Sequence, residues 1–168
     1  MNEFLLEYNN TLSLSVEILA AVTGLVFYNK YKPTAAKYFI YFLVYLSVCD
    51  FLNTYVHYIK NDGFLSFLEG SVFTRNFWWT TFYWEIGAIL FFAFYYCGIL
   101  ITERFKKIVR YSTYVFLIFS IIYIVLNWDD YFIRFFPVIG VLGAVIIFLC
   151  TAFYFFEISE LFRFLQSF

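Results

Sequence analysis

The chain has 168 residues, of which 64% are hydrophobic, 27% aromatic and only 14% charged, and its formal net charge is −1. A soluble domain carries about 45–50% apolar and about 25% charged residues, and a chain of this size cannot bury so large an apolar surface. The composition therefore excludes an ordinary soluble domain and predicts an integral membrane protein. Nothing in the charge balance indicates a nucleic-acid partner.

Five apolar runs approach the length of about 20 residues that a membrane-spanning helix needs: residues 12–28, 38–59, 77–102, 111–128 and 135–157. The first run is the shortest and contains Glu17. The alternating segments of about ten residues that are typical of a transmembrane barrel do not occur. The predicted fold class is therefore all-α, a polytopic transmembrane helix bundle of about five spans that forms one domain over residues 1–168.

Lysine and arginine are unevenly distributed among the predicted loops. The loops "NKYKPTAAK" and "ERFKKIVR" are strongly basic, whereas in "NWDDYFIR" two aspartates oppose a single arginine. Because basic loops stay in the cytoplasm, we expect the N-terminus outside and the C-terminus inside a cell membrane. The tryptophans then fall near the outer ends of their helices, as in an aromatic belt: Trp78, Trp79, Trp84 and Trp128.

Two amphipathic segments flank these runs. Residues 62–76 alternate apolar and polar side chains, which suits a short helix in the outer interface or a cap over the bundle. Residues 158–168 place apolar side chains on one helical face, so this tail either lies along the inner interface, continues the fifth helix or contacts a partner.

The second run carries a polar stripe. At about 100° per residue, Ser47, Asp50, Thr54 and His57 lie within a sector of about 80°, with Asn53 at its edge. Lipid offers no hydrogen-bond partner, so the stripe should face the interior of the bundle.

Three acids fall at a similar depth in the predicted membrane. A rise of about 1.5 Å per residue puts Glu17, Asp50 and Glu85 roughly 7–12 Å below the outer surface. Charge at the helix centre costs about 2.5–3.5 kcal/mol per residue, so at least one acid should be protonated, or a cation should lie nearby. The candidates for neutralising them are His57, Arg75, Arg134 and a bound ion. The sequence leaves two interpretations open, a structural polar network and an ion or proton site in a shared pocket.

Small residues predict close helix packing. Ala20 and Gly24 form a small-xxx-small pair in the first run, and Gly140 and Ala144 form another in the fifth. Such pairs let two backbones approach each other in a membrane.

Motifs for catalysis and for cofactors are absent from the sequence. The three cysteines lie inside apolar runs without a CxxC motif, and a lone histidine lacks the further ligands of a zinc site. GxSxG, HExxH, P-loop and GxGxxG patterns do not occur. We therefore expect no catalytic residues, no metal and no cofactor.

The segments "EILAAVTGLVFYNKYK", "KYFIYFLVYL" and "FYFFEI" resemble small uncharacterised multi-spanning inner-membrane proteins of Bacteroidetes-type bacteria. The resemblance implies a bacterial inner-membrane location and implies no activity. The residues favour a non-enzymatic membrane subunit or sensor that acts through protein partners or homo-oligomerisation. The alternative is a small cation- or proton-conducting channel or transporter component that uses the acidic cluster, and an enzyme is the weakest class.

Overall fold

The structure, a computed structural model, describes residues 2–59 and 63–166, with side chains for 12–59, 63–163 and 166. All regular elements among these residues are helical, as the sequence predicts. Contacts divide the chain into two compact units, Met1–Thr74 (unit 1) and Arg75–Phe168 (unit 2). A single domain over the whole chain stays a prediction.

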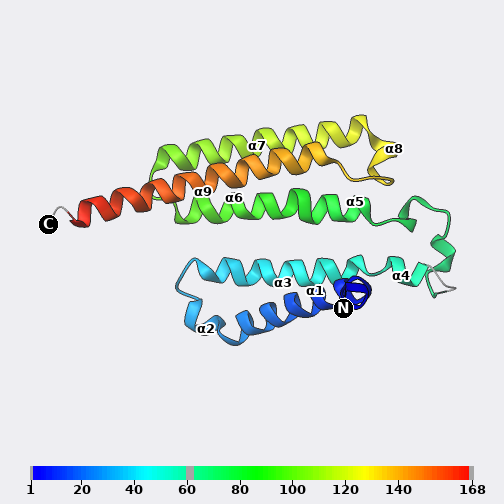
Figure 1. Ribbon diagram of the computed structural model, residues 1–168. Helices are drawn as coiled ribbons and strands as arrows, with labels where there is room; N and C mark the ends of the chain where they lie inside the picture. The colour runs from blue at the N-terminus through cyan, green and yellow to red at the C-terminus, as the bar shows by residue number, and fades with distance from the viewer. Residues whose placement is uncertain (1, 60–62, 167–168) are drawn as a thin grey trace. The chain divides into compact units, whose positions relative to one another are not determined.

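Unit 1 contains two long helices and two single helical turns: α1 (Asn2–Val26), α2 (Tyr28–Tyr31), α3 (Ala36–Asn53) and α4 (Val56–Ile59). The long helices α1 and α3 run antiparallel and contact each other (Figure 1). Near their shared turn, Gly24 packs against Ile40, and the hydroxyls of Tyr28 and Tyr41 are hydrogen-bonded. These two contacts set the register of the helix pair.

The second predicted run is not one continuous helix. The backbone N–H groups of Thr54 and Tyr55 bond to carbonyls only three residues back, and the Thr54 hydroxyl donates to the Phe51 carbonyl at 2.7 Å. Local bonds of this kind compete with the α-helical pattern and tighten its last turn. Asp50 therefore lies on α3, whereas His57 lies exposed on α4, and the predicted polar stripe is interrupted between them.

The described part of the 62–76 segment forms two short 3₁₀ turns rather than one helix: η1 (Ser66–Leu68) and η2 (Val72–Thr74). Gly70 separates the turns with a φ of 79°, a left-handed conformation that glycine adopts without steric cost. Phe64 and Phe67 are about three-quarters exposed, at 75% and 76%. Asp62 lies outside the described residues.

Unit 2 is built from six helical segments among its described residues: α5 (Phe77–Thr80), η3 (Thr81–Ala88), α6 (Ile89–Ile99), α7 (Glu103–Leu126), α8 (Trp128–Tyr131) and α9 (Pro137–Gln166). The first three follow one another without interruption, and η3 is a π-helix. Helices α6, α7 and α9 pack together, with α9 parallel to α6 and antiparallel to α7 (Figure 1). Proline starts α9, where its missing N–H and fixed φ suit the first helical position.

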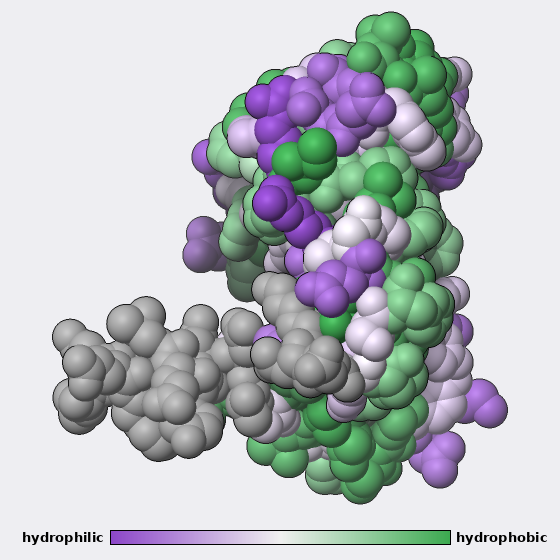
Figure 2. All heavy atoms as spheres, turned by 90° about the vertical axis from the view of Figure 1, so that its right-hand side faces the viewer, coloured by the Kyte–Doolittle hydropathy of each residue, from purple (hydrophilic) through white to green (hydrophobic). Residues whose placement is uncertain are grey.

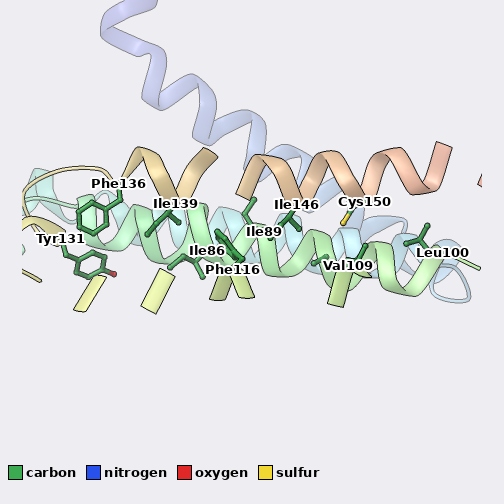
Figure 3. Packing of buried hydrophobic residues seen from close by; sticks show 11 residues of the cluster. Ile86, Ile89, Leu100, Val109, Phe116, Tyr131, Phe136, Ile139, Ile146 and Cys150 are labelled. Atoms are coloured by element: carbon green, nitrogen blue, oxygen red, sulfur yellow. The ribbon is translucent and has the colours of Figure 1, made fainter. Parts of the chain in front are cut away.

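An apolar core runs along the length of this three-helix unit. It is a cluster of buried side chains from all three long helices and the α8 connection: Ile86, Ile89, Ala93, Leu100, Val109, Phe116, Tyr131, Phe136, Ile139, Ile146 and Cys150. Figure 3 shows these side chains between the ribbons, with Phe116 of α7 close to Ile86 and Ile89. Unit 2 is therefore held together by continuous packing from one end to the other.

Four helical stretches are long and apolar enough to cross a membrane: Ala36–Ile59, Phe77–Ile99, Glu103–Leu126 and Pro137–Arg163. The remaining predicted span corresponds to the shorter apolar stretch Leu12–Val26, so the fifth span and the orientation stay predictions. Many large apolar side chains along these helices are exposed, as a lipid-facing surface requires. Viewed toward the α8 end, hydrophilic residues are interspersed with apolar ones (Figure 2).

Two predicted boundaries differ from the observed ones. The fourth long helix starts at Glu103 rather than at residue 111, because its charged first turns are helical although they are not apolar. The last helix continues to Gln166, so the described part of the 158–168 tail extends this helix, which is one of the three predicted alternatives. Phe168 lies outside the described residues.

Candidate functional site: a carboxyl pair and a π-helical acid

Two carboxyl groups meet in unit 1. Glu17 lies on α1 and Asp50 on α3, and the two carboxyl groups lie close enough to interact electrostatically. The contact agrees with the antiparallel register in which Gly24 packs against Ile40. A carboxylate only accepts hydrogen bonds, so a bond between two carboxyl groups requires a proton on one of them. The pair is thus chemically suited to hold one proton between two helices.

Polar atoms near the pair differ in how well they are satisfied. The Ser47 hydroxyl donates to the Leu43 carbonyl at 2.9 Å, one turn earlier in the same helix. Glu17 Oε2 and Asn53 Oδ1, in contrast, are buried acceptors without a hydrogen-bond partner among the described residues. Buried acceptors of this kind are costly in a folded protein unless a donor reaches them. Of the predicted stripe, Asp50 and Asn53 are therefore the residues that fit a site, and Ser47 is locally satisfied.

The Glu17 side of the pair is open. Glu17 lines a shallow surface depression together with Leu12, Ser13 and Val16, all on α1. Glu17 therefore borders the outer surface of α1 as well as the contact with α3.

Glu85 lies in unit 2, within the π-helix η3. π-helical turns are rare and are found frequently at functional sites. The Glu85 Oε1 atom faces Gly140 of α9, where a Cβ would lie 3.9 Å from it, and Oε2 is buried without a hydrogen-bond partner among the described residues. Thr81, one turn earlier, is fully buried, and its hydroxyl approaches the Glu85 carboxyl without the geometry of a hydrogen bond. Glu85 therefore points into the packed interface with α9.

Of the three acids that the sequence predicts in one pocket, only Glu17 and Asp50 lie in the same unit. Glu17 and Asp50 meet, whereas Glu85 belongs to the other unit, so the convergence of all three on one site stays a prediction. His57 lies beyond the end of α3, so a face shared by His57 and Asp50 stays a prediction. Among the described residues, no group of three or more His, Cys, Asp or Glu side chains is placed to hold a metal ion.

In unit 1, one predicted packing residue lies at a tight helix contact. A Cβ added to Gly24 would lie 3.2 Å from two side-chain carbons of Ile40, closer than most real Cβ contacts. Ala20, one turn earlier, is half-buried. Gly24 thus allows α1 to approach α3, as small residues do in membrane helix pairs.

In unit 2, the closest approach is made by a glycine that the small-xxx-small search missed. A Cβ added to Gly143 would lie 2.8 Å from Ile89 Cγ1 and 3.7 Å from the Glu85 carbonyl oxygen. Gly140 contacts the Glu85 side chain, whereas the predicted partner Ala144 is exposed. The signal lies in the spacing of "GVLG", since residues three apart share a helical face.

Glu157 is a further structural acid that the sequence reasoning missed. Its carboxylate accepts the backbone N–H of Ile101 at 2.8 Å and that of Thr102 at 2.7 Å. The first N–H groups of a helix lack partners within the helix, and Glu157 supplies one from the far end of α9. This contact starts α7 at Glu103 and leaves both oxygens of the carboxylate with a donor.

No protein-family model matches the sequence, and comparisons with curated proteins and with solved structures give no significant match. The function is therefore inferred from the geometry of the two units.

Proposed function

We propose that the protein is a non-enzymatic integral membrane subunit or sensor, and that its state depends on a proton held between Glu17 and Asp50. It acts through protein partners or through homo-oligomerisation. The four membrane-length apolar helices support the membrane part of the proposal. Basic loops and the resemblance noted above support a bacterial inner-membrane location with the N-terminus outside.

The observation that carries the proposal is the contact between two acids on different helices. With one proton present, the pair is a hydrogen bond that joins α1 to α3. Without it, two negative charges about 4 Å apart repel by about 4 kcal/mol at an effective dielectric constant of 20. That energy is large enough to alter the packing of a two-helix contact. Proton loss therefore weakens the α1–α3 pair.

The surface around the long helices is available to a partner. Between 17% and 28% of the residues in the four long apolar stretches are buried within the chain. The remaining surface faces lipid or neighbouring proteins, so a change in how α1 packs on α3 alters a surface that such a neighbour contacts. Binding of a second protein or a second copy of the chain would in this way depend on the proton held between α1 and α3.

Infrared difference spectroscopy of the full chain in lipid nanodiscs tests the proton. The wild type should show a protonated-carboxyl C=O band that titrates with pH, and both Glu17→Gln and Asp50→Asn should remove or shift it. Glu69→Gln, which changes an exposed acid of unit 1, is the matched control and should leave the band unchanged. A band that survives both substitutions at the pair contradicts the proposal.

The oligomeric state of the same samples, measured by light scattering across the same pH range, tests the coupling to assembly. We expect the wild type to change its state with pH and Asp50→Asn to lose that dependence. If the wild type has the same oligomeric state at every pH, the proton does not act through homo-oligomerisation.

A second candidate function is a small proton- or cation-conducting component of a channel or transporter. The open depression beside Glu17 favours it, because conduction needs access from the surface. In proteoliposomes that contain a pH-sensitive dye, Asp50→Asn should then abolish proton flux while leaving the yield of folded protein intact. Flux equal to that of the wild type would exclude the pair from the pathway.

A further inference from the structure

Two hydroxyl groups in unit 2 behave differently from the other helical hydroxyls. Thr113 and Thr151 donate to the carbonyl four residues back, at 2.7 Å and 2.9 Å, as threonines in apolar helices commonly do. Thr81 and Ser120 are both fully buried, at 0% exposure, and their oxygens have no hydrogen-bond partner among the described residues. Their hydroxyls are therefore directed away from their own helix backbone.

The packing register places Ser120 at the level of Glu85. Rings of Tyr123 and Phe136 contact at 5.2 Å, and those of Phe105 and Phe153 at 4.4 Å, which fixes the antiparallel alignment of α7 with α9. In that alignment Ser120 of α7 lies level with residues 138–139 of α9, within one helical turn of Gly140. Gly140 in turn faces the Glu85 carboxyl. Three partnerless buried oxygens, Thr81 Oγ1, Glu85 Oε2 and Ser120 Oγ, thus occupy one layer of the bundle.

The backbone around this layer departs from regular α-helix packing on both sides of the carboxyl group. Glu85 and Thr81 both lie in the π-helix, whose wider turn departs from the α-helical pattern on either side. The residue that faces Glu85 from α9 is a glycine, so α9 places no side chain of its own at that position, and an added Cβ would lie 3.9 Å from Oε1. Two ion pairs among the described residues of unit 2, Lys106 with Glu103 and Arg134 with Asp130, lie near its two ends.

We infer that this layer, lined by Thr81, Glu85, Ser120 and Gly140, is a binding site for a monovalent cation such as Na⁺. Hard cations take oxygen ligands, and two hydroxyls with one carboxylate supply them. One carboxylate exactly balances one unit of positive charge, whereas a divalent ion would leave a net charge in a medium of low dielectric constant. The site lies in unit 2 and does not depend on the proton pair proposed for unit 1.

Thermal unfolding of the full chain in nanodiscs, followed by tryptophan fluorescence, tests the site. NaCl is compared with choline chloride at equal ionic strength, which separates cation binding from charge screening. A ligand that binds only the folded state raises Tm in a saturable way, and at 100 times Kd we expect a rise of about 5 °C or more. Ser120→Ala and Thr81→Val each remove one oxygen with little change in volume, and both should abolish most of the rise.

Thr113→Val is the matched control, because it removes a hydroxyl of α7 that already bonds to its own backbone. It should keep the full Na⁺-dependent rise in Tm. Glu85→Gln should lose the rise without a lower Tm in choline chloride, since the amide carries no charge that needs a counterion.

Three results would overturn the inference. The first is that the wild type has the same Tm in NaCl and in choline chloride. The second is that Ser120→Ala and Thr81→Val both keep the full rise in Tm, and the third is that only Glu17→Gln or Asp50→Asn removes the rise. The last result would assign the cation to unit 1. If one hydroxyl variant fails to fold, the other carries the same test.

Discussion

Unit 1 and unit 2 each place a carboxyl group where two helices meet, but they satisfy it in different ways. In unit 1, the partner of Glu17 is another acid, Asp50. In unit 2, Glu157 accepts two backbone N–H groups from the start of α7. The first arrangement needs a proton, whereas the second is complete with a carboxylate. An acid between two helices is therefore a candidate functional residue mainly where the fold gives its carboxylate no hydrogen-bond donors.

The two units also differ in how much apolar packing supports them. Unit 2 has a cluster of 11 buried residues that spans three helices. The long helices of unit 1 form one hairpin, α1 with α3, in which Gly24 packs against Ile40. A change at the carboxyl pair should therefore disturb unit 1 more than a similar polar change disturbs unit 2.

Replacing Gly143 with leucine should have the largest effect, because it forces a side chain into the α6–α9 contact that holds unit 2 together. Even a Cβ would lie 2.8 Å from Ile89. Overpacking of this kind costs about 3 kcal/mol. The free energy of unfolding can be measured by denaturant titration in detergent micelles.

Gly98→Leu is the control for this change, since nothing lies within 4 Å of a Cβ at that position, which is on α6 near its end. It should leave the unfolding free energy of the protein nearly unchanged. Equal losses of unfolding free energy for the two variants would show that the close contact at Gly143 does not stabilise unit 2.

Glu157→Ala should have the next largest effect. It removes the acceptor of two charge-assisted hydrogen bonds at 2.7 Å and 2.8 Å and leaves two backbone N–H groups without partners. We expect a loss of about 2 kcal/mol. Glu160→Ala changes an exposed acid in the same helix and should cost almost nothing. A loss at residue 160 as large as that at residue 157 would mean that the hydrogen bonds from Ile101 and Thr102 to Glu157 do not stabilise unit 2.

Much of the fold is readable from composition and length alone. Apolar runs of membrane length predict the long helices, and helix α9 begins close to its predicted start because Pro137 suits the first helical position. The start of α7 is not readable in this way. It depends on Glu157, which is remote in the sequence and reaches the α7 terminus only after α9 has packed.

The candidate site shows the same limit. Depth and helical face predict that Glu17 and Asp50 share a site, and the two acids lie close to each other in unit 1, while their role as a site stays a prediction. For His57 the helical-wheel geometry is less direct, because a turn at Thr54 and Tyr55 separates α3 from α4. The π-helix around Glu85 reflects a change in hydrogen-bond register that no residue type in "TFYWEIGA" announces.

A double-mutant cycle on Glu17 and Asp50 sharpens the contrast between the units. If the two acids share a hydrogen bond, Asp50→Ala and Glu17→Ala should each destabilise the protein, and the double variant should cost less than their sum. We expect a coupling energy of about 1 kcal/mol. The unfolding free energies of the four proteins give this value directly. Additive losses would show that the acids do not act as a pair.

The smallest expected effect concerns one tyrosine in each unit. In unit 2, Tyr131 is 8% exposed and donates to the Trp78 carbonyl at 2.8 Å, and burial raises the pKa of its phenol. The phenol therefore stays a neutral donor through the physiological range, and Tyr131→Phe should cost about 1 kcal/mol at every pH in that range.

In unit 1, the hydroxyl of Tyr41 bonds to that of Tyr28 at an exposed position, where water or headgroups replace a lost partner. Tyr41→Phe should therefore cost about 0.5 kcal/mol or less. The two variants remove the same atom, so a comparison of their unfolding free energies isolates the effect of burial. A larger loss at residue 41 than at residue 131 would mean that the α1–α3 hairpin depends on its polar contacts more than unit 2 does. Burial would then not explain the difference between the two hydrogen bonds.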